Sequence, residues 1–171
     1  MRGECDIRFH GTSTLHDFTG TARCLPFSVD LGGEAGGGTG IAAADVAVPV
    51  DGMDTGNGDR DVRMREMFGS GRFPMIRGSV RNVDVEAFRR LAGMEGTVPF
   101  DLDLRIRDVE KTVTVTATHI RTEGEQVRFD FSFPVSLKKY GLKAPSFLFF
   151  VRVGDRVDVT GNVRLKSSSK E

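Results

Sequence analysis

The chain of 171 residues has the length of one domain. Hydrophobic residues make up 39% of it and charged residues 28%, a composition that suits a folded core and excludes a disordered chain. Lys plus Arg and Asp plus Glu number 24 each, so the basic excess that nucleic-acid binding needs is missing. The longest apolar run, residues 147–151, is too short for a membrane helix. We therefore expect one domain, residues 1–171, that neither binds nucleic acid nor spans a membrane.

In chain order, alternation of apolar and polar residues predicts one strand after another. Each strand would have one buried and one exposed face, as in an antiparallel sheet. About eight such strands in one domain predict an all-β fold that closes as a barrel or a sandwich. The residues of the predicted buried faces are Ile7, Phe9, Leu25, Phe27, Val29, Leu31, Val46, Val48, Val50, Val98, Phe100, Leu102, Leu104, Ile106, Val113, Val115, Val127, Phe129, Phe131, Phe133, Val135, Leu137, Val157, Val159, Val163 and Leu165.

Two segments interrupt the alternation and predict short helices over residues 61–69 and 84–93. Asp61 and Asp84 are good N-cap residues, because a carboxylate accepts hydrogen bonds from the first free N–H groups of a helix. A glycine ends each segment, as is typical of a helix C-terminus. Their apolar residues recur at helical spacing at Met64, Met67, Phe68, Phe88 and Leu91.

Glycine and aspartate mark the predicted turns between strands. Gly154 and Asp155 predict a two-residue hairpin, and reversals are expected at Gly124 and Asp108. Residues 32–40 are rich in glycine but lack the Lys-Ser/Thr ending of a phosphate-binding loop. We interpret them as a connector.

The two cysteines, Cys5 and Cys24, lie on the first two predicted strands. A turn centred near Leu15 would place Cys5 opposite Pro26, which is within two residues of Cys24. A disulfide is therefore geometrically allowed and would suit an oxidising compartment, and two buried thiols are the alternative.

Residues 46–78 resemble the signature of the YceI-like, polyisoprenoid-binding proteins. In that family a strand leads to Thr-Gly, then Arg-Asp, a short helix, Phe-Pro and a new strand. Residues 9–22, 104–115 and 136–147 are similar to further segments of the family, whereas nothing is recognised over residues 32–40 and 82–97. The residues that match the signature are Thr55, Gly56, Arg60, Asp61, Met64, Phe68, Phe73 and Pro74.

The resemblance implies an extended antiparallel lipocalin-like barrel that holds an isoprenoid or similar lipid in its lumen. It also implies export to the periplasm and no catalytic machinery, although the sequence itself shows no signal-peptide pattern. We therefore expect an eight-stranded barrel with one or two short helices that carries or sequesters a long apolar lipid. We expect no enzyme activity and no cofactor other than an isoprenoid or quinone-type ligand, in a monomer or homodimer.

The predicted lumen is apolar and largely aromatic, because the chain has 13 Phe, one Tyr and no Trp. A hydrocarbon ligand needs no polar partners along its length, so such a surface suits it. The alternatives are a filled core in a structural or interaction module, and an enzyme acting on a small hydrophobic substrate. The predicted lumen residues are Phe9, Phe27, Val48, Val50, Met53, Met64, Phe68, Phe100, Leu102, Leu104, Phe129, Phe131, Phe133, Tyr140, Phe147 and Phe149.

Four polar residues are assigned separately. Lys138 and Lys139 would contact a polar head group, and a solvated strand end is the alternative. Asp61 is expected to cap its helix, and Arg60 to pair with a nearby carboxylate and fix the loop.

The three histidines lack acidic or cysteine partners at ligand spacing, so we expect no metal site. No Gly-x-Ser-x-Gly segment marks a catalytic nucleophile.

Overall fold

The computed structural model describes residues 1–14, 17–32, 40–143 and 153–168. The alternating segments form strands, because alternation places the apolar side chains of a strand on one face of a sheet. The elements of the described residues, in chain order, are β1 (Arg2–Ser13), β2 (Phe18–Arg23), β3 (Phe27–Gly32), β4 (Ile41–Pro49), η1 (Val50–Gly52), α1 (Gly58–Phe68), β5 (Met75–Asp84), α2 (Val85–Leu91), β6 (Val98–Ile106), β7 (Val109–Glu123), β8 (Gln126–Ser136), η2 (Lys138–Tyr140) and β9 (Val153–Lys166).

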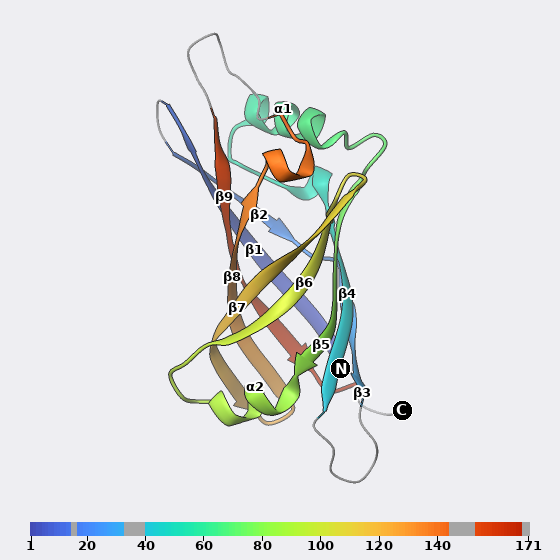
Figure 1. Ribbon diagram of the computed structural model, residues 1–171, viewed down its shortest axis with the longest axis vertical. Coiled ribbons are helices and arrows are strands. Elements are labelled where there is room, and N and C mark those ends of the chain that lie inside the picture. Colours follow the sequence, from blue (N-terminus) through green and yellow to red (C-terminus); the bar gives the residue numbers. More distant parts are fainter. Residues whose placement is uncertain (15–16, 33–39, 144–152, 169–171) are drawn as a thin grey trace.

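The strands form a closed antiparallel barrel, which confirms the predicted fold class (Figure 1). From β3 to β9 each strand pairs with the next in the chain, and β9 returns to pair with β1. β1 pairs with β3 through Arg2 and Gly3 and with β2 from Asp6 to Gly11, so β2 continues the line of β3. The barrel thus closes with eight strands, and β2 is an additional short strand.

The barrel is elongated and has a helix at each end (Figure 1). α1 lies across one end together with η2, and α2 lies at the opposite end. We call these the α1 end and the α2 end. The buried core is divided in the same way: a large cluster contains residues of α1, and a small cluster around Ala117 and Ile120 packs beneath α2.

α1 begins earlier than the sequence predicts, and Asp61 is not its cap. The helix starts at Gly58, and the side chain of Asn57 accepts a hydrogen bond from the Arg60 N–H at 3.1 Å. Asp61 lies inside the first turn, where its carboxylate accepts bonds from the N–H and the hydroxyl of Thr55 at 2.9 and 2.6 Å. Asp61 therefore secures the loop before the helix, while Asn57 satisfies the free N–H group. Gly69 ends the helix in the left-handed conformation, as predicted.

α2 follows its prediction closely. The carboxylate of Asp84 accepts hydrogen bonds from the N–H groups of Glu86 and Ala87 at 2.9 and 3.2 Å. Phe88 packs beneath the helix against Phe100 and Phe129, with ring centroids 6.3 and 5.0 Å apart. The cap and the apolar face predicted from the sequence are both confirmed.

Two of the three predicted turns are confirmed, and one is wrong. β6 and β7 reverse next to Asp108, and β7 and β8 reverse at Gly124, which has a positive φ of 60°. Gly154 and Asp155 lie within β9, because β9 begins at Val153, which pairs with Ser13 of β1. Most of the predicted connector, residues 33–39, lies outside the described residues.

A disulfide joins Cys5 on β1 to Cys24 just after β2. The register between the strands, with Asp6 opposite Arg23, brings the two cysteines face to face with their Cα atoms 5.4 Å apart. Of the two alternatives left open by the sequence, the structure therefore has the disulfide.

Candidate ligand-binding cavity

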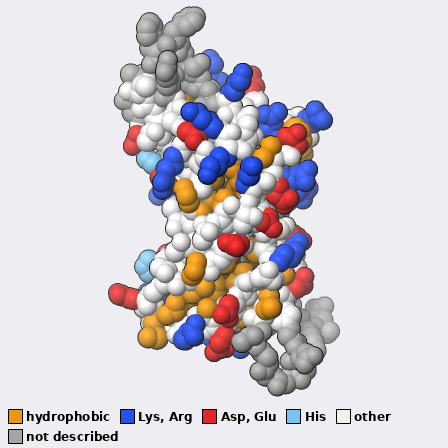
Figure 2. All heavy atoms as spheres, viewed as in Figure 1, with side chains coloured by type: hydrophobic (Ala, Val, Ile, Leu, Met, Phe, Trp, Pro, Cys, Tyr) orange, Lys and Arg blue, Asp and Glu red, His pale blue; other side chains and the backbone are white. Residues whose placement is uncertain are grey.

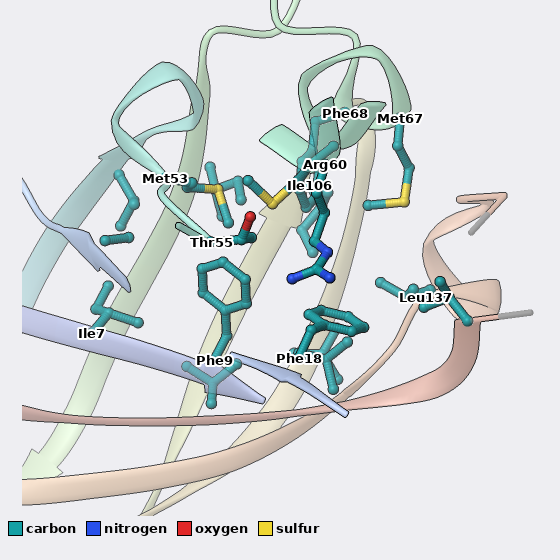
Figure 3. A pocket seen from close by; sticks show the side chains of 18 of the residues that line it. Ile7, Phe9, Phe18, Met53, Thr55, Arg60, Met67, Phe68, Ile106 and Leu137 are labelled. Atoms are coloured by element: carbon teal, nitrogen blue, oxygen red, sulfur yellow. The ribbon is translucent and has the colours of Figure 1, made fainter. Parts of the chain in front are cut away.

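The barrel interior is hollow at the α1 end. A cavity of about 430 Å³ lies between α1 and the inner faces of the strands (Figure 3). α1 contributes Met64, Met67 and Phe68 to its lining, and the strands opposite contribute Phe9 and Phe18. Because these side chains are hydrocarbon or thioether, the cavity favours an apolar occupant over water.

A second cavity of about 410 Å³ occupies the α2 end. Its lining includes Phe88 and the alternating side chains of β8, which bring Phe129, Phe131 and Phe133 to its wall. The two cavities adjoin, because one ring of residues lines both of them. This shared ring consists of Ile7, Val48, Ile76, Leu104, Phe133 and Val159.

Most of the predicted lumen residues line these cavities. Val50 and Tyr140 are buried and line neither cavity, and Phe147 and Phe149 lie outside the described residues. The predicted residues on the cavity walls are Phe9, Phe27, Val48, Met53, Met64, Phe68, Phe100, Leu102, Leu104, Phe129, Phe131 and Phe133.

Sequence reasoning missed Phe18 on β2 and Ile76 on β5, which also line the lumen. The inward positions that follow them along each strand include Gly20 and Gly78. A glycine interrupts the run of large apolar residues, so the alternation is hard to see. The sequence signal that could have identified these two lumen residues is a Phe or Ile followed, after one intervening residue, by Gly.

Glycines on neighbouring strands leave space for four aromatic rings of the lumen. A Cβ at any of these glycines would overlap the ring opposite. The rings therefore lie against the barrel wall, in space that a side chain would otherwise fill, and the middle of the lumen stays open. The pairs are Phe27 with Gly3, Phe18 with Gly11, Phe9 with Gly20, and Phe131 with Gly161.

A polar rim borders the cavity at the α1 end. Thr55, Asn57, Asp59 and Arg60 contribute to the lining, all from α1 or the loop before it. The side chain of Arg60 extends from α1 into the cavity, and its guanidinium lies over the ring of Phe18, 5.6 Å from the ring centre (Figure 3). Among the described residues, no carboxylate forms an ion pair with Arg60. The predicted pairing of Arg60 is therefore wrong: of its two acidic neighbours in the chain, Asp61 binds Thr55, and Asp59 forms no ion pair with a described residue.

Lys138 and Lys139, the predicted head-group contacts, lie on η2 with exposed side chains and line neither cavity. The backbone N–H of Lys138 donates to the Asp155 carboxylate at 2.7 Å, and the Ser136 hydroxyl donates to it at 2.6 Å. These bonds, the one from Ser136 first, hold the pKa of Asp155 below its usual value. Asp155 therefore anchors η2 to β9.

The barrel wall is incomplete beside the α2 end. Within the described residues, β5 and β6 pair only from Arg77 opposite Arg105 to Ser79 opposite Asp103, and beyond this point the strands diverge (Figure 1). Figure 2 shows hydrophobic side chains gathered on this face of the molecule, above α2. The residues on the two sides of this gap between the strands also line the α2-end cavity. They are Val80 and Val83 of β5 and Phe100 and Leu102 of β6.

The requirements of a metal site and of a membrane-spanning helix are not met by the described residues. His10 lies 3.4 Å from Asp17 and His119 lies 3.0 Å from Asp130, each as a single pair near the surface. In the part of the chain that the structure describes, no three His, Cys, Asp or Glu side chains gather as a metal site would require. No described helix has the length and apolar character needed to cross a membrane.

The closed antiparallel barrel with a hollow apolar interior places the chain in the lipocalin-like class of folds. The family model described as the YceI-like domain matches residues 6–165. The chain therefore belongs to the YceI-like family, which confirms the resemblance seen in the sequence. Among curated proteins, none matches the sequence.

Solved structures with the same fold span nearly the whole chain. Burkholderia cenocepacia BcnA has a TM-score of 0.69 at 16% identity and covers 95% of this chain and 96% of its own. A polyisoprenoid-binding domain from Saccharophagus degradans, implicated in plant cell wall breakdown, has a TM-score of 0.66 at 14% identity and covers 98% of both chains. A mutant Campylobacter jejuni YceI protein with a monobromobimane guest has a TM-score of 0.59 at 14% identity, covering 84% of this chain and 82% of its own. These likenesses establish the shared fold.

Proposed function

We propose that this protein binds a long apolar lipid, such as a polyisoprenoid or a quinone-type lipid, and carries or sequesters it without chemical change. One observation supports this most: two apolar cavities adjoin inside one barrel, through a shared ring of six residues. An elongated hydrocarbon fits such a shape better than a compact substrate does. The polyisoprenoid-binding domain among the similar structures adds support from the same family fold.

The energetics of this binding favour a long chain. Each methylene moved from water into the lumen contributes about 0.8 kcal/mol before the cost of ordering the chain is counted. Several isoprene units therefore suffice for useful affinity without any polar contact. The described polar side chains of the α1-end cavity gather at its rim, which leaves the rest of its wall without the convergent acids and bases of a catalytic site.

We also propose that the protein works in an oxidising compartment outside the cytoplasm. The disulfide between Cys5 and Cys24 supports this, because such bonds persist where thiols are not kept reduced. Titration of thiols in the denatured, unreduced protein isolated from its native compartment tests the proposal. We expect no free thiol, and two free thiols would contradict it.

Lipid extraction after purification without detergent, followed by mass spectrometry, tests the binding function directly. We expect a long-chain apolar lipid to be recovered, or an added polyprenol to be taken up. Ala22→Phe adds a ring to the wall of the α1-end cavity and should lower the amount bound several-fold. Ala47→Phe is the matched control, because Ala47 lines neither cavity. A protein that yields no lipid and takes up none has a different function.

A further inference from the structure

We propose that Arg60 binds the head group of the ligand, and that this head group carries a single carboxylate. This inference narrows the proposed function and rests on it: among the long apolar lipids that the lumen would hold, it selects those that end in a carboxylate, such as an isoprenoid acid or a fatty acid, over a polyprenol or a quinone. It starts from the position of Arg60. The side chain reaches from the first turn of α1 into the α1-end cavity and stops over the ring of Phe18 (Figure 3).

Arg60 brings donors and charge into the cavity without an acceptor to match them. A guanidinium has five N–H donors, and the face of Phe18 attracts its charge but accepts no conventional hydrogen bond. No described carboxylate lies at ion-pair distance from it. A half-buried cation in this state is stabilised by any anion that enters the cavity.

The stability of α1 does not explain why arginine stands at this position. The first turn of a helix favours negative side chains, so a cation there opposes the helix dipole. Asp59 and Asp61 already supply the favourable charge. The capping of the helix uses Asn57 and only the backbone N–H of Arg60. The side chain of Arg60 is thus available for a ligand.

The neighbours of Arg60 restrict the anion to a small one. A carboxylate matches a guanidinium through two parallel hydrogen bonds and balances its single charge. A phosphate or diphosphate would bring more negative charge than one cation neutralises, beside the carboxylate of Asp59 on the same rim. Lys138 and Lys139, which would offset that charge, line neither cavity. The carboxylate of Asp61 accepts two hydrogen bonds from Thr55 and is not among the ion-pair partners of Arg60 in the part of the chain that the structure describes.

Oleic acid, oleyl alcohol and oleyl phosphate test this assignment, because they share one hydrocarbon chain and differ only in the head group. Their affinities are measured by competition with a fluorescent apolar dye, at a pH at which the acid is ionised. We expect the acid to bind about tenfold more tightly than the alcohol, as a charge-assisted pair implies. The phosphate should bind more weakly than the acid.

Variants assign the preference to Arg60. Arg60→Met keeps an apolar side chain of similar reach and should reduce the affinity for the acid to that for the alcohol, with the affinity for the alcohol unchanged. Arg60→Lys keeps the charge but loses the paired donors, and should retain part of the preference. Arg63→Met is the matched control, because Arg63 is an exposed residue of the same helix that lines neither cavity.

Each other outcome has a definite meaning. Equal affinities for the acid and the alcohol in the unaltered protein would overturn the carboxylate assignment, whether or not the variants fold. Tightest binding of the phosphate, lost in Arg60→Met, would keep Arg60 as the contact but overturn the carboxylate. A fall in alcohol affinity as large as the fall in acid affinity would show that Arg60 only shapes the cavity. Failure of the dye and all three ligands to bind would contradict the proposed function itself.

Discussion

Phe9 and Gly20 face each other across β1 and β2, and the Phe9 ring occupies the space beside the glycine Cα. A large side chain in the lumen therefore takes little of its volume. The same arrangement recurs for Phe131 and Gly161 across β8 and β9. An aromatic interior in this barrel is thus compatible with a hollow one, because glycine provides a recess for each ring.

Gly20→Ala is expected to move the Phe9 ring into the α1-end cavity, because the new methyl group would overlap the ring. The displacement should lower the free energy of unfolding by about 1–3 kcal/mol and reduce dye uptake. Urea denaturation and a dye titration measure the two effects. Gly71→Ala is the control, because no heavy atom lies within 4 Å of a Cβ there. Unchanged uptake in Gly20→Ala would mean that the ring has room elsewhere.

Tyr140 has a buried hydroxyl, and the residue as a whole is only 3% exposed. The hydroxyl has no hydrogen-bond partner among the described residues, and burial raises its pKa. Removing an unpaired buried polar group relieves its desolvation, so Tyr140→Phe should raise the free energy of unfolding by about 1 kcal/mol. Thermal or urea unfolding checks this. A loss of stability in Tyr140→Phe would reveal a bond that the hydroxyl makes in solution.

η2 depends on one carboxylate, that of Asp155 on β9. Asp155 accepts bonds from the Ser136 hydroxyl and the Lys138 N–H, and its carbonyl accepts from the Leu137 N–H. The folded state lowers the pKa of the carboxyl below 3.8, so it binds a proton less readily than the unfolded state does. Its contribution to stability is therefore present above about pH 4 and is lost as the pH falls through the folded pKa.

Asp155→Asn should lower the free energy of unfolding by about 1 kcal/mol at neutral pH, since a partly exposed charge-assisted bond becomes a neutral one. The variant and the parent should converge in stability below the folded pKa, where both side chains are uncharged. Denaturation curves over a range of acidic pH measure this. Asp108→Asn is the control, because Asp108 lies in the exposed turn between β6 and β7, outside any helix, and its carboxylate forms no ion pair with a described residue. A constant difference between variant and parent at all pH values would contradict the role of the charge.

The sequence predicts elements well where one local signal dominates. The alternation along β6 and β8 predicts a strand and no other element in each place. Asp84 likewise predicts one start for α2. The predicted start of α1 is wrong because five of the residues from position 54 to position 61 are good N-cap residues. Which of them caps the helix depends on how the preceding loop packs in the folded protein. β9 passes through Gly154 and Asp155 because Val153 still pairs with Ser13 of β1 and the Leu137 N–H donates to the Asp155 carbonyl.

The candidate site is predictable in part for the same reason. Inward phenylalanines on β8 follow from alternation alone, but Phe18 and Ile76 do not, since glycine hides the pattern on β2 and β5. Which cation reaches the lumen depends on where the helix starts. With Asn57 as the cap, Arg60 falls in the first turn and its side chain enters the α1-end cavity, a result that needs the folded loop.

The two cavities make the length of the bound chain a testable property of the barrel. A chain that fills both must pass the shared ring, to which β4 contributes Val48 and β5 contributes Ile76. A short chain fits in either cavity alone. A longer hydrocarbon chain should therefore bind more tightly until both cavities are filled. Each added methylene should contribute about 0.8 kcal/mol of binding free energy before the cost of ordering the chain.

Val48→Phe places a ring at this junction and separates the cavities. Binding of a long polyprenol should weaken by about 100-fold, since several methylenes would lose their apolar surroundings. Binding of farnesol, which needs only one cavity, should change little. Val62→Phe, on the exposed side of α1, is the control because its side chain lies outside both cavities. A parallel loss for both ligands would place the whole chain in one cavity, whereas a selective loss for the longer one would show that the lipid extends from α1 to α2.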